Sequence, residues 1–333
     1  MDTNSQISVI IPAYNAARWL PRAVEACRTQ TLSPTEIIIV DDASSDATLD
    51  VAKQLAAQHA RVNVLRHKRN SGPAAARNRG AAESRGEFLA FLDADDHWDP
   101  TKLEKQMRAM RAQPQTGLVL TAVRERNMHG LTLREMWHRI PETRQERVRA
   151  FFTFKLNMLT PTALMPRHVF EEVGGFDPDL RIGEDYFLFM KIAAAYEMIY
   201  LPELLVDRWV VPFSHSKSGS PAYMETEFKK FIDTSLRKFP YLHEYVPIVT
   251  AKVHFQIGRR FQREDDLRGA RRHFLRSLFV RPRLKPLLAL LTAILPRSWQ
   301  AMFRETPRRW RLLAALSLGR SEVGNKKITI NAD

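Results

Sequence analysis

The sequence contains only one cysteine, Cys27, among its 333 residues. A single thiol excludes an internal disulfide and suits a reducing compartment. The first six residues lack the charged and apolar segments of a signal peptide. The longest apolar candidate for a membrane span, residues 286–296, has about half the length that a span requires. These absences predict a cytoplasmic protein that does not cross a bilayer by itself.

Acidic residues are scarce in the last third of the chain. Residues 1–215 carry 27 basic and 27 acidic side chains, whereas residues 216–333 carry 24 and 10 and hold the entire net charge of +14. Between residues 267 and 279, cationic and apolar residues alternate at helical spacing. Basic amphipathic helices suit an anionic membrane surface, but they also suit a helical region that packs its apolar face on a core. Both alternatives remain open for a basic helical region over residues 216–320, followed by a frayed tail over 321–333.

Apolar, β-branched runs alternate with helical patterns in the first hundred residues. The runs at 7–12, 36–42, 62–65 and 88–93 read as strands, with helical patterns after the first three of them. Pro12 is expected to stop the first strand, because it cannot donate to a sheet. Alternation of this kind predicts an α/β fold with a mostly parallel sheet and right-handed crossovers.

Carboxylates gather at the ends of two of these strands. One run ends on Asp93, Asp95 and Asp96, and the other ends on two aspartates, the second of which is Asp42. We expect them close together, because parallel strands end at one sheet edge, where α/β proteins bind ligands. A Mg²⁺ or Mn²⁺ ion that also binds phosphate would offset their repulsion. The acidic cluster alone fits a metal site or a solvated turn equally well.

Four short motifs carry a more specific signal through their order. They are residues 9–15 (VIIPAYN), 40–46 (VDDASSD), 69–80 (RNSGPAAARNRG) and 91–96 (FLDADD). Together they resemble the signature of bacterial family 2 inverting glycosyltransferases with the GT-A fold, over about the first two thirds of the chain. The resemblance implies a Rossmann-like sheet flanked by helices and a catalytic domain over residues 1–215.

The resemblance also implies roles for individual residues in binding a nucleoside-diphosphate sugar. The implied donor-nucleotide residues are Pro12, Ala13, Tyr14, Asp42, Arg69, Arg77 and Asp93. By the same resemblance, Asp42 contacts the base, Asp93 lies near the ribose and the metal, and Asp95 is the principal ligand of Mg²⁺ or Mn²⁺. Taken singly, Tyr14 reads more simply as a packed loop aromatic and Arg77 as a helix-surface arginine.

Residues 174–185 (GGFDPDLRIGED) resemble the acceptor-side motif of the same family. The resemblance makes Asp185 the catalytic base and Glu184 a neighbour that positions the acceptor. Glycosyl transfer needs such a base, because the attacking hydroxyl must lose its proton. Acids in the first turn of a helix are also explained by the helix dipole. On the same predicted helix, Lys191 stands where the family often has arginine.

The region after this helix gives weaker signals. Residues 198–201 and 204–211 read as strands that return to the sheet. The family often carries a histidine or arginine here that closes over the metal or the pyrophosphate, and Arg208 and His215 are the candidates. Their spacing departs from the family's pattern, and a lone histidine is more often an ordinary packed or surface residue. The arginine-rich residues 121–154 carry no motif, although they lie where the acceptor side is expected.

Two other classes of protein compete with this interpretation. A basic protein could bind nucleic acid, but the motif-bearing part is neutral and shows no zinc spacing or aromatic RNA-binding strand. A sugar nucleotidyltransferase would place a glycine-rich phosphate loop after the first strand, where this chain has residues 12–15 (PAYN).

We therefore predict an enzyme, a metal-dependent inverting glycosyltransferase of the hexosyltransferase type. It is expected to move a sugar from a nucleoside-diphosphate sugar to a hydroxyl of a glycan or lipid-linked acceptor, in cell-envelope polysaccharide synthesis. The expected location is the cytoplasm, with contact at the inner face of the cell membrane. No nucleic-acid partner is expected.

Overall fold

The computed structural model describes residues 6–210 and 220–294. The chain packs as two compact units, Met1–Val253 and His254–Asp333, and each is described by itself. The first unit extends past residue 215, where the basic part of the sequence begins. The expected tail over residues 321–333 lies outside the described residues.

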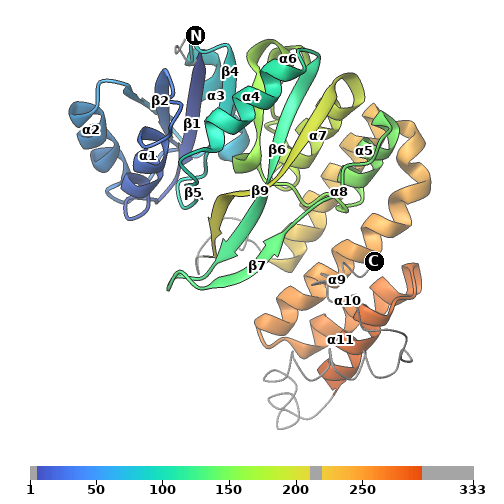
Figure 1. Ribbon diagram of the computed structural model, residues 1–333. Coiled ribbons are helices and arrows are strands. Elements are labelled where there is room, and N and C mark those ends of the chain that lie inside the picture. The colour runs from blue at the N-terminus through green and yellow to red at the C-terminus, as the bar shows by residue number, and fades with distance from the viewer. Residues whose placement is uncertain (1–5, 211–219, 295–333) are drawn as a thin grey trace, which may run out of the picture. The chain divides into compact units, whose positions relative to one another are not determined.

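Nine strands among the described residues of the first unit form one sheet (Figure 1). They are β1 (Ile7–Ala13), β2 (Glu36–Asp41), β3 (Val62–Arg66), β4 (Phe88–Phe91), β5 (His97–Trp98), β6 (Thr116–Arg126), β7 (Thr132–Met136), β8 (Leu164–Pro166) and β9 (Glu197–Trp209). Their order is β3-β2-β1-β4-β8-β6-β9-β5, with β7 paired to β6. The first four strands in this order are parallel, whereas β8 runs antiparallel to both of its neighbours. The predicted α/β fold is confirmed.

Helices accompany the sheet in sequence and continue beyond it. Those of the described residues are α1 (Leu20–Arg28), α2 (Thr48–Gln58), α3 (Pro73–Glu83), α4 (Lys102–Ala112), α5 (Arg144–Phe152), α6 (Arg167–Glu172), α7 (Glu184–Ala195), α8 (Pro221–Lys238), α9 (Val246–Arg263), α10 (Leu267–Val280) and α11 (Leu284–Ile294). Among the described residues, no helix combines the length and the hydropathy that crossing a membrane requires.

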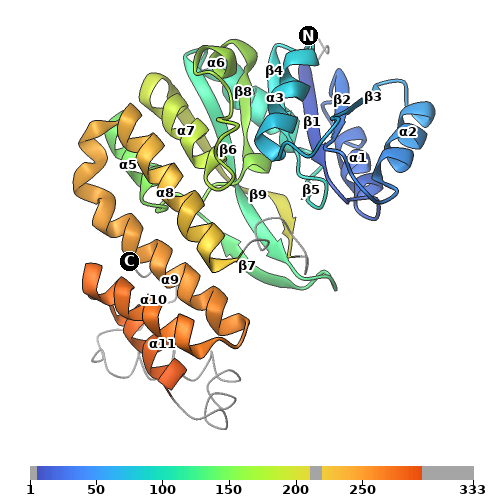
Figure 2. The ribbon, with the colours of Figure 1, turned by 180° about the vertical axis from the view of Figure 1, so that it is seen from behind.

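The central strands form because their side chains are buried on both faces of the sheet. Ile7, Val9 and Ile11 of β1 share one hydrophobic core with residues of α1, α2 and α4. On the opposite face, Gly80 of α3 lies so close to Ile10 that an added Cβ would be 2.5 Å from its side chain. Figures 1 and 2 show these two layers from opposite sides. The sheet is therefore held rigidly between helices, and its carboxyl edge is free to carry loops.

The first strand does not end at its proline. Pro12 pairs with Val40 of β2, and β1 continues to Ala13. On the other side of β1, β4 has already ended, because Phe91 is its last residue and lies opposite Ile10. Pro12 thus stands where β1 has a neighbour on one side only, and proline is tolerated at such edges. The expectation that Pro12 stops the strand was wrong by one residue.

The two strands expected around residues 198–211 are a single strand, β9. In its pairing with β6, Leu201 lies opposite Thr121 and Leu204 lies opposite Ala122, so Pro202 and Glu203 have no partner in the ladder. A β-bulge accommodates such extra residues without ending the strand. The gap expected between residues 201 and 204 is therefore a bulge within one strand.

Candidate active site

The strands β1, β2 and β4 end side by side at one edge of the sheet. Ala13 pairs with Asp41, and Ile10 pairs with Phe91, so the segments that follow these strands leave the sheet at the same edge. Pro12 and Ala13 stay within β1, whereas the Tyr14 side chain is 41% exposed just beyond it. This edge gathers most of the predicted donor-binding residues.

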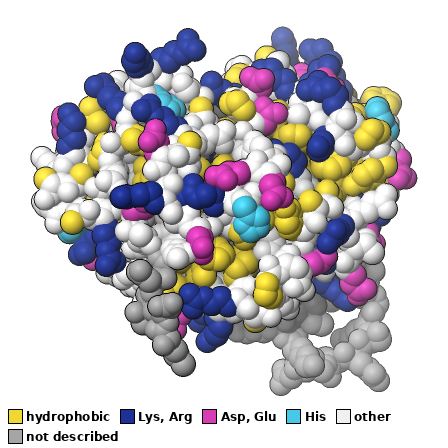
Figure 3. Space-filling view, turned by 90° about the horizontal axis from the view of Figure 1, so that it is seen from above, with side chains coloured by type: hydrophobic (Ala, Val, Ile, Leu, Met, Phe, Trp, Pro, Cys, Tyr) yellow, Lys and Arg dark blue, Asp and Glu magenta, His cyan; other side chains and the backbone are white. Residues whose placement is uncertain are grey.

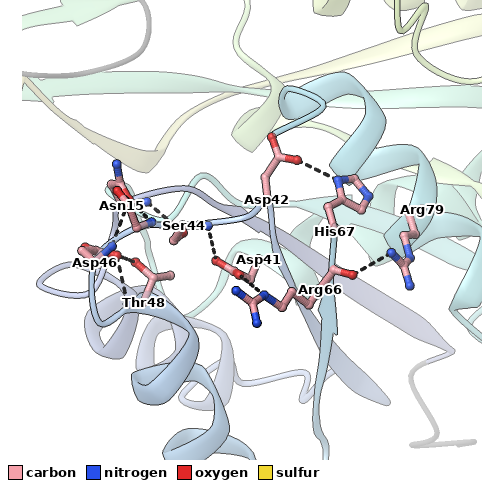
Figure 4. Close-up of polar contacts among 10 residues, drawn as sticks. Asn15, Asp41, Asp42, Ser44, Asp46, Thr48, Arg66, His67 and Arg79 are labelled. Carbon is pink, nitrogen blue, oxygen red and sulfur yellow. Dashed lines mark hydrogen bonds and ion pairs between the residues drawn. The ribbon is translucent and has the colours of Figure 1, made fainter. Parts of the chain in front are cut away.

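The carboxylate of Asp42 is held by the segment between β3 and α3, and Figure 4 shows its contact with His67. It accepts hydrogen bonds from the backbone N–H of Ser71 (2.8 Å) and of Gly72 (2.7 Å), and His67 Nδ1 lies 2.7 Å from its Oδ1. Gly72 has a φ of +87°, a conformation that glycine adopts without strain. Asp42 therefore fixes the start of α3, whether or not it also contacts a nucleotide.

A second hydrogen-bond network joins the loop after β1 to the residues that follow β2 (Figure 4). Asn15 Oδ1 accepts from the backbone N–H of Ser45 (2.9 Å) and of Asp46 (3.3 Å). Thr48 Oγ1 accepts from the backbone N–H of Ala16 at 2.7 Å. Because these bonds join the loop after β1 to the loop after β2, the pocket wall that Tyr14 is predicted to form is rigid.

The acids at the end of β4 form a tight turn, residues 93–96, which we call the acidic turn. The N–H of Asp96 donates to the carbonyl of Asp93 (3.0 Å), and Asp96 Oδ1 accepts from the backbone N–H of Trp209 (3.2 Å). Burial and the neighbouring Asp93 raise the pKa of Asp95 to about 6. Burial, Asp95 and Asp93 raise the pKa of Asp96 well above its ordinary value. Mutual repulsion of this kind is relieved by a cation.

The residues present fit a divalent ion that is shared with a substrate. Among the described residues, no three His, Cys, Asp or Glu side chains form a ready-made metal cage. Mg²⁺ is usually held by one or two carboxylates together with substrate phosphates. Asp95 has the carboxylate for this role, because it accepts no hydrogen bond from any other described residue and repels its neighbours. The acidic turn could therefore hold Mg²⁺ or Mn²⁺ only as a partial ligand set.

A buried arginine joins the acidic turn to the start of α7. Arg77 donates to Asp93 Oδ1 at 2.7 Å and to Glu184 Oε1 at 3.1 Å, and its guanidinium lies 5.3 Å from the centre of the Phe176 ring. Its side chain is almost entirely buried, so it is not the surface arginine that the sequence also allowed. Arg77 thus links the predicted donor side and the predicted acceptor side through one cation.

Asp185 follows Glu184 in the first turn of α7. The helix begins after Gly183, whose φ of +81° belongs to the left-handed region, and an added Cβ there would lie 2.7 Å from the Phe231 ring. Asp185 Oδ1 accepts a hydrogen bond from the N–H of Tyr186 (2.8 Å). Burial and the neighbouring Glu184 raise the pKa of Asp185 to about 8, while Arg77 opposes the rise. A carboxylate with a raised pKa is suited to accept a proton near neutral pH.

Lys191 lies on α7 and joins this helix to the chain around residue 174. Its Nζ donates to the carbonyls of Val173 and Gly175, both at 2.7 Å. Burial lowers the pKa of Lys191 to about 8. Lysine has three donors on a flexible stem, so it can hold both carbonyls. The side chain therefore anchors the start of residues 174–185 to α7.

Nothing in the sequence marks Arg22, although the structure brings it to the acidic turn. Its Nη2 donates to the backbone carbonyl of Asp95 at 2.7 Å, and its guanidinium lies 4.2 Å from the centre of the Trp209 ring. A cation on an aromatic face is attracted by the ring quadrupole. Because Arg22 lies in the first turn of α1 and belongs to no motif, only the packing of that helix under the sheet edge reveals its contact with the acidic turn.

A second group lies where β6, β7 and β9 meet, and its members Glu125 and Arg134 belong to no sequence motif. Glu125 accepts hydrogen bonds from Arg134 (3.0 Å) and Arg208 (2.8 Å). These bonds lower the pKa of Glu125 although burial opposes the shift. Arg208, one of the two candidates near the end of β9, also interacts electrostatically with Asp96 and Asp93. The cross-strand register that creates this group could not be derived from the sequence.

The two remaining predicted site residues are Arg69 and His215. Arg69 lies exposed in the loop that Asp42 holds. His215 lies outside the described residues, so its predicted role stays a prediction.

The molecular surface adds one observation on the nucleic-acid alternative. On the face seen in Figure 3, basic and acidic side chains of the described residues are interspersed. Nucleic-acid binders gather basic residues on the face that contacts the phosphates. This face therefore has the mixed charge of an ordinary protein surface.

Comparisons with known proteins identify the family of the chain. The profile of Glycosyl transferase family 2 matches residues 8–174, half of the chain. An uncharacterized glycosyltransferase of Haemophilus influenzae is 29% identical over 257 residues, which are 77% of this chain and 82% of that protein. The putative teichuronic acid biosynthesis glycosyltransferase TuaG of Bacillus subtilis is 41% identical over 104 residues, which are 31% of this chain and 41% of that protein. The matched segment thus spans less than half of TuaG.

Solved structures show the same fold. Residues 1–349 of S. aureus TarS, in complex with UDP-GlcNAc, superpose with a TM-score of 0.58 at 20% identity, covering 86% of this chain and 90% of that chain. The mannosyltransferase PcManGT of Pyrobaculum calidifontis, in complex with GDP-Man and Mn²⁺, has a TM-score of 0.56 at 19% identity, covering 93% of this chain and 84% of that chain. The chain therefore belongs to glycosyl transferase family 2 and has the GT-A fold.

Proposed function

We propose that this protein is a metal-dependent, inverting glycosyltransferase that moves a sugar from a nucleoside-diphosphate sugar to a hydroxyl of a glycan or lipid-linked acceptor. The proposal includes a cytoplasmic enzyme of cell-envelope polysaccharide synthesis, whose basic C-terminal region contacts an anionic membrane surface. The envelope role is supported by the relative TuaG of Bacillus subtilis, which is named as a putative glycosyltransferase of teichuronic acid biosynthesis.

The observation that carries the proposal is the arrangement around Arg77. This cation contacts Asp93 of the acidic turn and Glu184 beside Asp185. The acidic turn has the chemistry to bind a cation and a diphosphate, and Asp185 has the chemistry to accept a proton. One buried contact thus holds the two halves of a transfer site together.

In the proposed reaction, the acceptor hydroxyl attacks the anomeric carbon from the face opposite the nucleoside diphosphate, which leaves. Asp185 takes the hydroxyl proton as the new bond forms. Glu184, held by Arg77, positions the acceptor beside this base. Tyr14 and the rigid loops around it bind the nucleoside, and Asp93 lies at the ribose. A bound Mg²⁺ or Mn²⁺ ion supplies positive charge that stabilises the departing diphosphate.

The donor base is left open by the relatives, because one structure holds UDP-GlcNAc and the other holds GDP-Man. Calorimetric titration with UDP, GDP, dTDP and CDP, each with and without Mn²⁺, tests the donor site directly. We expect one nucleotide to bind tightly, and only with the metal. If a folded protein bound none of them under either condition, the proposed donor site would be wrong.

The stereochemical part of the proposal has a separate test. With the preferred donor and a soluble hydroxyl acceptor, the anomeric configuration of the first product is read from its proton NMR coupling constant. Inversion is expected, because a single base and a single displacement leave no covalent sugar on the enzyme. A product with retained configuration would contradict the role of Asp185.

A further inference from the structure

The second unit contains two helices that pack on each other through small residues. Ala270 and Phe274 of α10 form a core with Ala289 and Ala293 of α11. Arg271 Nε also donates to the carbonyl of Ala293 at 2.9 Å. The face of α11 that carries Ala289 and Ala293 is thus buried against α10.

The outward face of α11 is apolar as well. Leu284, Leu287, Leu288 and Leu291 are between 41% and 68% exposed, and their spacing of three, four and seven residues places them on one side of the helix. We call these four residues the leucine stripe. A helix that faces water carries polar residues at this spacing, so the stripe is unusual for a solvated surface. Phe279 at the end of α10, 86% exposed, is a further large apolar side chain left in water.

The charged side chains of α10 and α11 are all basic. Residues 267–294 contain seven basic side chains and no Asp or Glu. Arg281, Arg283 and Lys285 stand at the start of α11 or just before it, next to Phe279 and Leu284. A surface that combines exposed leucines with basic side chains, and has no acidic ones, fits a partner that is apolar inside and anionic at its boundary.

We infer that the leucine stripe and Phe279 form the face by which this protein docks on the surface of an anionic lipid bilayer. The leucines enter the headgroup boundary, and the neighbouring cations contact the lipid phosphates. Charge complementarity selects this occupant, since a second copy would bring two sets of seven basic residues together. The chain beyond residue 294 is also net basic and would be repelled in the same way. The inference rests on the proposed membrane contact and is independent of the transfer chemistry.

The test is sedimentation of the full chain with vesicles of phosphatidylcholine alone or mixed with phosphatidylglycerol. We expect binding to the anionic vesicles only, falling steeply with salt because surface charges are screened. The double variant Leu287→Ser/Leu291→Ser should reduce the partition coefficient at least about tenfold, because it removes two inserted side chains. Arg281→Glu/Lys285→Glu should also reduce it.

A matched control is available in the first unit. Leu131 and Leu133, beside and within β7, are 66% and 51% exposed, as much as the leucine stripe. The variant Leu131→Ser/Leu133→Ser should bind vesicles like the unchanged protein. Equal losses in both double variants would mean that exposed leucines act without regard to place, which would overturn the inference.

Two further outcomes would also overturn it. If the protein bound vesicles of phosphatidylcholine alone as well as vesicles with phosphatidylglycerol, the docking would not require anionic lipid. If the unchanged protein formed a dimer that persists at high salt, and Leu287→Ser/Leu291→Ser abolished that dimer, the leucine stripe would be the contact with a second copy. Metal-dependent nucleotide binding by each variant shows that the protein is folded. If the unchanged protein binds nucleotide but does not bind anionic vesicles, the docking inference fails and the proposed function stands. If it binds anionic vesicles but no nucleotide, the docking inference stands and the proposed function fails.

Discussion

Two neighbouring strands end in aspartates at the same sheet edge, yet the aspartates are held differently. Asp42, after β2, accepts hydrogen bonds from two backbone N–H groups and lies 2.7 Å from His67. Asp95, after β4, accepts none from another described residue, and burial with its neighbour Asp93 raises its pKa to about 6. An acid whose partners are inside the protein stabilises the fold, whereas an acid that lacks them stores repulsion that a ligand can relieve. Asp185, with one hydrogen bond from Tyr186 and a pKa of about 8, belongs with Asp95.

The strongest test of this contrast is Asp185→Asn. We expect kcat to fall about 10³-fold, because the amide cannot accept the hydroxyl proton. Steady-state kinetics with the preferred donor measures this, and calorimetry should show nucleotide binding within about twofold of the unchanged protein. Near-normal turnover would remove Asp185 from the role of base.

The second test is Asp95→Asn. We expect the Mn²⁺-dependent part of donor affinity to fall about 100-fold, because the principal ligand is lost. Without metal, the free energy of unfolding at pH 7 should rise by about 1 kcal/mol, because a partly buried, repelled carboxylate is replaced by a neutral amide. Calorimetry and denaturant unfolding measure the two effects. A loss of stability together with unchanged donor binding would place Asp95 with the structural acids.

Asp42→Ala should show the opposite pattern. The backbone N–H groups of Ser71 and Gly72 would lose their acceptor, so we expect the free energy of unfolding to fall by about 2–4 kcal/mol. Denaturant unfolding measures this, with Asp95→Ala as the matched aspartate from the other strand. Equal stability of the two alanine variants would abolish the distinction between the strand ends.

The pH dependence of stability gives a fourth test. The folded-state pKa of Asp185, about 8, lies above the ordinary aspartate value of 3.8. Between these values the folded protein keeps a proton that the unfolded chain has lost, so the free energy of unfolding falls as the pH rises through this window. In the metal-free protein, Asp185→Asn should remove about 3–4 kcal/mol of that fall between pH 5 and 8, because one proton of difference changes the free energy of unfolding by about 1.4 kcal/mol per pH unit. If the two proteins gave parallel curves in denaturant titrations across this range, the carboxyl would not titrate as expected.

The smallest effect is expected at Arg22, which holds the acidic turn through the carbonyl of Asp95. Arg22→Lys keeps the charge but loses the planar contact with Trp209, so we expect the KM for the donor to rise about threefold to tenfold with kcat nearly unchanged. Arg18 is the matched control, because its guanidinium lies 4.8 Å from the Trp19 ring but makes no described contact with Asp95. Kinetics of Arg18→Lys should match the unchanged protein. Equal effects of both lysine variants would assign the Arg22 effect to general surface charge.

Local patterns predicted much of the frame of the molecule. The apolar runs located β1 to β4, and the alternation of elements predicted the α/β fold, because buried parallel strands need crossover helices. The order and spacing of the four motifs were sufficient to identify the family from the sequence alone. The predicted strand boundaries were wrong where pairing with a neighbouring strand sets them. Pro12 lies inside β1, and Pro202 lies in a bulge of β9. The two-residue strand β5 is too short for any pattern to reveal.

The sequence by itself determined which acids lie at the carboxyl edge of the sheet and which family the chain belongs to, because both follow from residue order along the chain. Only the tertiary structure decided which acids are partnered. Asp42 meets Ser71 and Gly72, Arg77 meets Glu184, and Arg22 meets Asp95 across separations that no local pattern encodes. The leucine stripe was likewise separated from the core of its unit only by packing, since a helix that is apolar all round does not show in its sequence which side its partner covers.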